Sequence, residues 1–338
     1  MKVSALGEFG LIDLLAEMIS GAQDKSAVSY RKLIIGIGDD AAAWKGDATT
    51  QLITTDSLFQ DVHFRLSTTS WHELGWKALA VNLSDIAAMG GVPMYAVVSL
   101  ALPPDTEVDD VRALYQGMIE LAQRFGVAIV GGDTYRAPLV SITVTVLGSA
   151  GGKNGKMLTR SAARSGEKIA VTGALGASAA GMEMLDKKLE LDAESGGQLR
   201  RAFLQPWPRV AEGQRLVALG VKTAIDISDG LISDLKHICD SSGVGARVEM
   251  ERIPIAPAVR THFSDRALEL ATTGGEDYEL LFTASDDVID RVKAKLSCPV
   301  TVIGEVVAEK PGSVVMVDGH GKLLSLAKTG WEHFKGMK

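Results

Sequence analysis

The stretch WKALAVNLSDIAAMGG, from Trp76 to Gly91, constrains the chain most, because it predicts a long apolar helix that carries a carboxylate. Alanine, leucine and methionine dominate it, and a pair of glycines ends it. Asn82 and Asp85 are three residues apart and therefore share one helix face. The stretch contains no Arg, and no Lys beyond its second residue, to neutralise Asp85. Asp85 either lies at the water-facing edge of the helix or binds a cation.

Length and composition indicate a globular protein of about two domains. The chain has 338 residues, of which 46% are hydrophobic and 23% are charged. Its net charge is −7 and it has no run of Lys or Arg, which argues against nucleic acid or an anionic membrane as a partner. Glu8, Asp13 and Glu17 interrupt the apolar N-terminal segment, which argues against a signal peptide. We expect a cytoplasmic protein that acts on small molecules.

The cysteines and histidines give little sign of a metal or redox site. Cys239 and Cys298 stand far apart, so we expect two inert thiols and neither zinc nor a disulfide. Among the six histidines only His63, in the segment DVHF, suggests a functional role. An ordinary structural histidine is the alternative.

The order of predicted elements indicates two domains, residues 1–149 and residues 150–338. The first is expected to be an α+β layer with a mixed sheet, and the second an α/β domain. Residues 148–168 are rich in glycine and polar residues and have little apolar periodicity, so the boundary is placed there. In the first domain we expect helices at residues 8–19, 71–89 and 107–125. The strands expected there are residues 32–37, 51–55, 95–102, 127–130 and 140–147. In the second domain we expect a helix at residues 177–189 and strands at residues 168–172, 222–227, 246–250, 280–283 and 300–306.

Four predicted strands share one pattern, in which an apolar run passes through Gly, Ser or Thr into carboxylates. One such strand end is an ordinary turn, because Asp and Gly favour turns. Four of them, together with Asp85, predict carboxylates gathered on one rim. The residues expected there are Asp40, Asp56, Asp133, Asp226 and Asp229.

Such a cluster requires either cations or several raised pKa values. Two unit charges ~4 Å apart repel by about 4 kcal/mol at an effective dielectric of about 20. Oxygen ligands without His or Cys favour Mg²⁺, which keeps coordination positions open for phosphates. An acidic, solvated surface without metal is the alternative.

The glycine-rich loops match no common nucleotide-binding signature. A Walker A loop is absent, and so are the HRD and DFG motifs of protein kinases. Residues 36–41, GIGDDA, resemble the dinucleotide fingerprint, but two Asp residues would face the pyrophosphate. Residues 172–178, TGALGAS, are better placed, between a strand and a helix whose first amides could hold an anion. A tight strand-to-helix turn is the alternative there.

Taken in order, the motifs of this chain resemble those of the thiamine-monophosphate kinase family. They are GEF, GIGDDAA, TTDSL with DVHF, KALAVNLSDIAAMGG, IVGGDT, LTRS, DISDGL, GGEDYEL and TGWEHF, and they run over residues 6–334. The resemblance implies a two-domain fold like that of aminoimidazole ribonucleotide synthetase and a cytoplasmic homodimer active in thiamine diphosphate biosynthesis. It also implies Mg²⁺-dependent transfer of the γ-phosphoryl group of ATP to thiamine monophosphate, giving thiamine diphosphate and ADP.

The resemblance further implies roles for individual residues. The implied Mg²⁺ ligands are Asp40, Thr54, Thr55, Asp56, Asp85, Asp133, Asp226 and Asp229, while the role of Asp39 is left open. ATP would contact Gly132, Asp133, Arg160 and Ser228, and thiamine monophosphate would contact His63, Glu276 and Trp331. Asp85, Asp133 and Asp229 are the implied catalytic residues. The chain departs from the family pattern at Ala137, where a glycine is expected.

The chemistry fits a direct, in-line transfer. A phosphate monoester with a second pKa near 6 is mostly dianionic at pH 7, so the acceptor needs no general base. Cations that bring two polyanions together are then the main requirement. Arg160 could contact a phosphate or be a solvated linker residue, and Trp331 could stack on thiamine or anchor the C-terminus.

Several other readings stay open. Within the superfamily, a selenophosphate synthetase would carry a Cys near its N-terminus and a hydrogenase-maturation protein would end in one, and this chain has neither. An NAD-dependent oxidoreductase and a non-catalytic metal-binding protein are alternatives from other classes. The apolar strand at residues 95–102 is compatible with a subunit contact or with a buried position.

Overall fold

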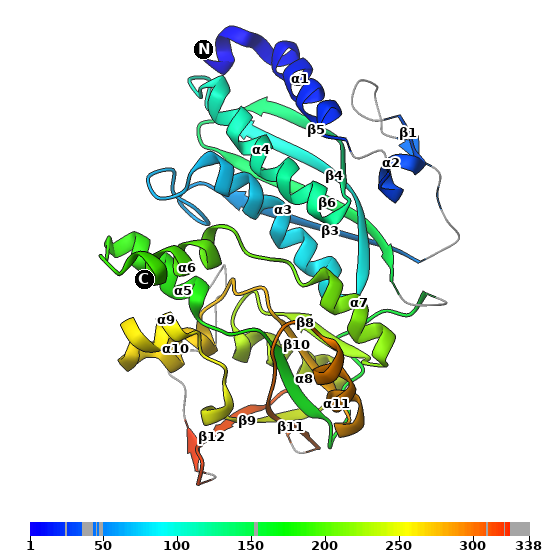
Figure 1. Ribbon diagram of the computed structural model, residues 1–338, viewed down its shortest axis with the longest axis vertical. Coiled ribbons are helices and arrows are strands. Elements are labelled where there is room, and N and C mark those ends of the chain that lie inside the picture. Colours follow the sequence, from blue (N-terminus) through cyan, green and yellow to red (C-terminus); the bar gives the residue numbers. More distant parts are fainter. Residues whose placement is uncertain are drawn as a thin grey trace. The chain divides into compact units, whose positions relative to one another are not determined.

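The computed structural model describes residues 1–23, 26–35, 43–44, 46, 50–151, 155–308, 310–320 and 322–324. The chain forms two compact units (Figure 1). The first comprises Met1–Ile86 and Val92–Ala150, and the second comprises Ala87–Gly91 and Gly151–Lys338. Both combine helices with a sheet, as the mixed α/β class requires.

The first unit is built on a four-stranded mixed sheet with the strand order β3-β6-β4-β5. β3 (Gln51–Phe59) pairs antiparallel with β6 (Ser141–Ala150), and β4 (Gly91–Leu102) pairs parallel with β5 (Ala128–Arg136). Along β6 the burial alternates, so that Val144 is buried and its neighbours are half-buried. This alternation places a hydrophobic core on one face of the sheet.

The helices of the first unit are α1 (Val3–Gly21), α2 (Val28–Lys32), α3 (Trp71–Ala88) and α4 (Val108–Phe125). Two glycines allow α3 and α4 to approach closely. A Cβ atom on Gly75 would lie 1.8 Å from the Leu114 carbonyl oxygen, and one on Gly117 would lie 1.9 Å from that of His72. β1 (Leu33–Ile35) and β2 (Ala43–Trp44) form a separate two-stranded antiparallel sheet.

The second unit is built on a seven-stranded sheet with the order β13-β12-β9-β11-β7-β10-β8. Among the described residues, its neighbouring strands pair antiparallel, except that β12 pairs parallel with β9. The strands are β7 (Lys168–Thr172), β8 (Thr223–Asp226), β9 (Gly245–Glu249), β10 (Leu280–Ala284), β11 (Val300–Val307), β12 (Val314–Val317) and β13 (Leu323–Leu324).

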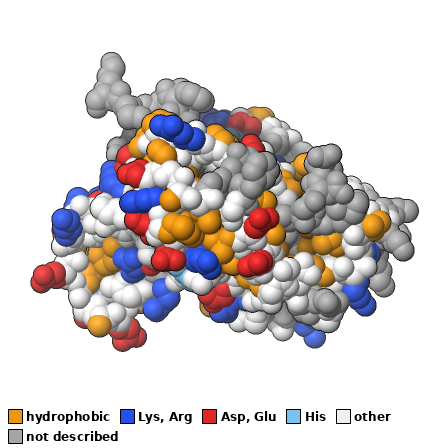
Figure 2. All heavy atoms as spheres, turned by 90° about the horizontal axis from the view of Figure 1, so that it is seen from above, with side chains coloured by type: hydrophobic (Ala, Val, Ile, Leu, Met, Phe, Trp, Pro, Cys, Tyr) orange, Lys and Arg blue, Asp and Glu red, His pale blue; other side chains and the backbone are white. Residues whose placement is uncertain are grey.

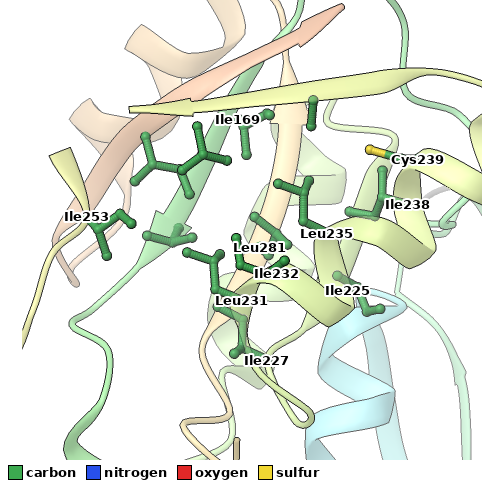
Figure 3. Close-up of a cluster of buried hydrophobic side chains, with 14 of the residues drawn as sticks. Ile169, Ile225, Ile227, Leu231, Ile232, Leu235, Ile238, Cys239, Ile253 and Leu281 are labelled. Carbon is green, nitrogen blue, oxygen red and sulfur yellow. The ribbon is translucent and has the colours of Figure 1, made fainter. Parts of the chain in front are cut away.

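Helices surround this sheet, and its largest core lies against α8. Ile225 and Leu281 of the sheet meet Leu231, Leu235 and other side chains of α8, as Figure 3 shows. The α-helices are α5 (Ala177–Lys187), α6 (Ala193–Leu204), α7 (Val210–Leu219), α8 (Leu231–Ser242), α9 (Pro257–His262), α10 (Ala267–Thr273) and α11 (Asp286–Lys295). Two short 3₁₀ helices, Met250–Arg252 and Ser264–Arg266, complete the described elements.

The predicted strands differ from the observed ones mainly in length. β3 continues to Phe59 and β5 to Arg136, so Asp56 and Asp133 lie inside strands and the prediction that they follow strand ends is wrong. Gly132 explains the error in β5. A Cβ atom there would lie 2.0 Å from the Val98 carbonyl oxygen, so this glycine allows close approach of β4 and does not mark a turn.

The face drawn in Figure 2 carries charges of both signs. On the face drawn in Figure 2, Lys and Arg side chains are interspersed with Asp and Glu, with hydrophobic side chains between them. No helix among the described residues is long and apolar enough to cross a membrane.

Candidate functional site

Three of the predicted metal ligands come together in the first unit. Thr54 and Asp56 lie on the same face of β3, two residues apart, and Asp85 lies in the last turns of α3. The Thr54 hydroxyl donates a hydrogen bond to Asp85 Oδ2, and the Asp56 and Asp85 carboxyl groups are hydrogen-bonded to each other. The sheet and the helix packed on it thus hold two acidic side chains in contact.

The electrostatics of this pair fit a cation. Desolvation and, after it, the adjacent Asp85 together raise the pKa of Asp56 to about 6. Although Asp56 is exposed as a residue, the protein around its carboxyl group weakens hydration enough to disfavour its charge. A hydroxyl oxygen and two carboxylates form a hard-oxygen donor set, which suits Mg²⁺. We therefore expect Thr54, Asp56 and Asp85 to hold this ion.

Thr55 and His63 occupy other positions around β3. The Thr55 hydroxyl lies 2.9 Å from that of Thr145, on the face opposite Thr54, so the Thr55 side chain does not join the Asp56–Asp85 pair. His63 lies in the turn after β3, where its Nδ1 accepts a hydrogen bond of 3.0 Å from the Phe59 amide.

Gly132 and Asp133 lie at the other edge of the same sheet. Asp133 pairs with Ser99 across β5 and β4, and both Gly132 and Asp133 are exposed. β3 and β5 are the two outer strands, so Asp56 and Asp133 do not lie on neighbouring strands of this sheet. Their roles stay predictions.

The motif DISDG of the second unit forms the connection from β8 to α8. Asp226 ends β8 and is 2% exposed, while Ser228 and Asp229 are partly exposed. The amides of Ser228, Asp229 and Gly230 all donate to Asp234 Oδ2, at 3.0, 3.1 and 3.1 Å. One carboxylate oxygen thus fixes three consecutive residues of the predicted ATP and metal loop.

Asp234 was not among the predicted site residues. It is 1% exposed, and burial raises its pKa to about 8, with Asp226 and Asp229 adding to the rise and the backbone amides opposing it. Asp229, Asp234 and His237 form the one group of three potential metal-ligating side chains found among the described residues. The spacing of Asp234, four residues after Gly230 in the first turns of a helix, was the available sequence signal.

The loop between α10 and β10, residues 274–279, lies beside the DISDG connection. The Glu276 amide donates to the Ser228 carbonyl oxygen at 2.8 Å, and the Tyr278 amide donates to that of Ile227 at 2.9 Å. A Cβ atom on Gly275 would lie 2.4 Å from the Ser228 carbonyl oxygen. The residue predicted to bind the acceptor is therefore held against a residue predicted to bind ATP.

The two charged residues after Glu276 anchor this loop. Asp277 accepts hydrogen bonds from the amides of Gly176 and Ser178, at 2.7 and 3.1 Å, in the first turn of α5. Desolvation raises the pKa of Asp277 to about 7, although the residue is only half-buried, which places the burial at its carboxyl end. Glu279 receives two hydrogen bonds from Arg209, at 2.7 and 2.5 Å.

Asp277 also settles the question of the TGALGAS turn. The first amides of α5 were expected either to hold an anion or to be a tight turn. The structure shows that two of them hold the Asp277 carboxyl group. This helix terminus is already occupied by the protein itself.

The remaining predicted residues are placed as follows. Arg160 is exposed, and its carbonyl oxygen accepts a 2.8 Å hydrogen bond from Ser242 at the end of α8. Asp39, Asp40 and Trp331 lie outside the described residues. Cys239 is buried and Cys298 is half-buried.

Comparison with known proteins identifies the family. The N-terminal domain of AIR synthase related proteins matches residues 38–150, and the C-terminal domain matches residues 164–317. Thiamine-monophosphate kinase of Escherichia coli (strain K12) is 38% identical over 336 residues, which cover 98% of this chain and 99% of that protein. The chain belongs to the thiamine-monophosphate kinase family.

Solved structures of the thiamine-monophosphate kinase family share the fold. The crystal structure of the enzyme from Stenotrophomonas maltophilia K279a has a TM-score of 0.79 at 37% identity, and covers 91% of this chain and 96% of that chain. A structure of AaThiL complexed with AMPPCP and TMP has a TM-score of 0.75 at 31% identity, and covers 99% of both chains. The predicted family and its two-domain mixed α/β fold are confirmed.

Proposed function

We propose that this protein is an ATP-dependent thiamine-monophosphate kinase that forms thiamine diphosphate and ADP. The observation that carries the proposal is the hydrogen bond between the Glu276 amide and the Ser228 carbonyl oxygen. It joins the loop implied to bind the acceptor to the loop implied to bind ATP. Family membership and the AaThiL complex with AMPPCP and TMP support the same two ligands.

The chain's own residues contribute binding and positioning. Gly132, Arg160 and Ser228 would contact ATP, and His63, Glu276 and Trp331 would contact thiamine monophosphate. Mg²⁺ held by the oxygens of Asp85, Asp133, Asp229 and the other predicted ligands would offset the negative charge of the two phosphate groups. Holding ATP and thiamine monophosphate in line then makes the transfer an effectively unimolecular step between two bound substrates.

A covalent intermediate is not part of the proposal. The acceptor is already a dianion near neutral pH, so no residue has to remove a proton from it. The predicted residues include no thiol and no serine paired with a base, the arrangement that would mark an activated nucleophile. We propose direct transfer from ATP to the acceptor phosphate.

We further propose that the protein is a cytoplasmic homodimer associating through the first unit. β3 and β5 are the outer strands of its sheet, and both carry exposed apolar side chains, Ile53 and Phe59 on β3 and Tyr135 on β5. Unpaired outer strands are common sites of association between chains. β4, at residues 91–102, is an inner strand with mostly buried side chains, so it is not the exposed contact considered above.

The acceptor specificity tests the proposed function. Purified protein is incubated with ATP and Mg²⁺ together with either thiamine monophosphate or thiamine, and products are separated chromatographically. We expect thiamine diphosphate from the monophosphate and no phosphorylated product from thiamine. Consumption of ATP without thiamine diphosphate would instead indicate a different acceptor, and no ATP turnover would favour a binding protein.

A further inference from the structure

The loop at residues 274–279 has a backbone that requires outside support. Glu276 and Tyr278 have φ values of 68° and 51°, in the left-handed region that residues with a side chain rarely adopt. Such residues keep this conformation only where their surroundings hold it. Asp277 lies between them and points into the protein.

Asp277 makes a connection that differs from an ordinary helix cap. Its two carboxyl oxygens accept the Gly176 and Ser178 amides of α5, about one hundred residues earlier in the chain. A usual cap residue belongs to its own helix and fixes only that helix. Asp277 instead ties the loop to α5, since the positive end of the helix favours a negative group there.

Neighbouring contacts leave Asp277 as the support between the two left-handed residues. The Tyr278 and Glu276 amides reach the DISDG connection, and Glu279, at the end of the loop, is held by Arg209 and by the Thr172 hydroxyl at 2.6 Å. The acidic groups that face Asp277 are Glu276 and Glu279. Without the two α5 amides, the Asp277 carboxyl group would face these like charges, and the segment between the two left-handed residues would lose its side-chain support.

We propose that Asp277 is a positioning residue for the acceptor, which holds Glu276 in its left-handed conformation beside Ser228. The inference rests on the proposed function and adds a residue that does not itself touch the substrate. It requires that loss of Asp277 weaken the binding of thiamine monophosphate more than the binding of ATP. The reason is that Asp234 fixes Ser228 and the DISDG connection separately.

Two variants separate this role from general loss of a helix cap. Asp277→Ala removes the carboxyl group, and Asp192→Ala removes the cap of α6, where Asp192 Oδ1 accepts the Ser195 amide at 2.9 Å. For Asp277→Ala we expect KM for thiamine monophosphate to rise about tenfold or more and KM for ATP to change less than about twofold. We expect amide hydrogen exchange in residues 274–279 to accelerate. Asp192→Ala should lower the melting temperature while leaving both KM values and this exchange unchanged.

Three results would overturn the inference. They are an equal rise of both KM values in Asp277→Ala, the same rise in Asp192→Ala, and unchanged exchange of residues 274–279. If Asp277→Ala does not fold, Asp277→Asn replaces it, because asparagine keeps one acceptor oxygen. For this variant we expect a smaller rise in KM for thiamine monophosphate, again without a matching rise in KM for ATP. A wild-type protein that forms no thiamine diphosphate would overturn the proposed function, and the exchange data alone would then decide whether Asp277 holds the loop.

Discussion

Asp56 and Asp85 show how this fold brings like charges together. A strand and a helix place the two carboxyl groups in hydrogen-bond contact, which is unfavourable when both are ionised. A cation bound between the two carboxyl groups, as proposed, would relieve this repulsion. Desolvation and, after it, this neighbouring carboxyl group raise the pKa of Asp56 to about 6.

We predict that the apparent Mg²⁺ affinity falls as pH decreases below about 6. The pKa of Asp56 in the fold, about 6, lies above that of an unfolded carboxyl group, so the metal-free protein binds a proton that Mg²⁺ must displace. The same shift means that Asp56 lowers the stability of the metal-free protein as pH rises through 6. Calorimetric Mg²⁺ titrations at several pH values measure both proton release and affinity.

Asp56→Asn is the control for this pH dependence. It removes the titrating group, so the metal-free variant should match or exceed the wild type in melting temperature at pH 8 while binding Mg²⁺ more weakly. An Mg²⁺ affinity that does not change with pH in the wild type would contradict the electrostatic account of the pair.

At the residue scale, sequence predicted the types of side chain better than their positions. The contact of Thr54, Asp56 and Asp85 agrees with the expectation that these oxygens gather. The face of the sheet on which Thr55 lies depends on strand register, and register requires the partner strand β6. The supporting roles of Asp234 and Asp277 depend on amides that the chain presents only after folding.

Among the elements, the α3–α4 pair illustrates how glycines set the packing of the first unit. Most of α3, which carries Asp85 in its last turns, is buried, and α4 lies close against its first turns. The missing Cβ atoms of Gly75 and Gly117 make that distance possible.

We predict that Gly117→Ala lowers the free energy of unfolding by about 1–3 kcal/mol or more, because the new Cβ atom would lie 1.9 Å from the His72 carbonyl oxygen. Urea denaturation measures the change. Gly196→Ala in α6 is the matched control, since its nearest contacts lie at 3.9 Å. In that helix alanine should stabilise by up to about 1 kcal/mol, and a similar loss in both variants would contradict the packing argument.

The elements themselves were largely predictable, with instructive exceptions. β7, at Lys168–Thr172, matches its expected range, because an apolar run bounded by Gly and polar residues has few other interpretations. β5 was predicted too short because Gly131 and Gly132 read as a turn. β12 was missed, and its parallel pairing with β9 joins segments far apart in sequence.

At the scale of the whole molecule, the exposed outer strands of the first sheet are the feature that a single chain leaves unexplained. Ile53 on β3 is 72% exposed, which is unusual for an isoleucine in a strand. Association of two chains would cover this side chain. Sequence alone could not distinguish such a strand from a buried one, because both are rich in Ile and Thr.

We predict a solution mass of about twice the 35.8 kDa of one chain. Ile53→Lys should shift the protein toward the monomer, because a charge would be buried in the interface. Light scattering after size-exclusion chromatography measures the mass. Met182→Lys, which changes an exposed apolar residue of α5 in the second unit, should remain dimeric, and a monomeric wild type would contradict the proposed association.

The most direct test of the account follows labelled phosphate through a single turnover. Protein is mixed with ATP labelled in its γ-phosphoryl group, Mg²⁺ and thiamine monophosphate, and the label is traced in product and protein. We predict that label enters thiamine diphosphate as fast as it leaves ATP, with none on the protein, and that Asp85→Asn folds normally but transfers at least about 100-fold more slowly. Label on the protein would contradict direct transfer, and an Asp85→Asn variant as fast as the wild type at saturating Mg²⁺ would contradict the metal-assisted site.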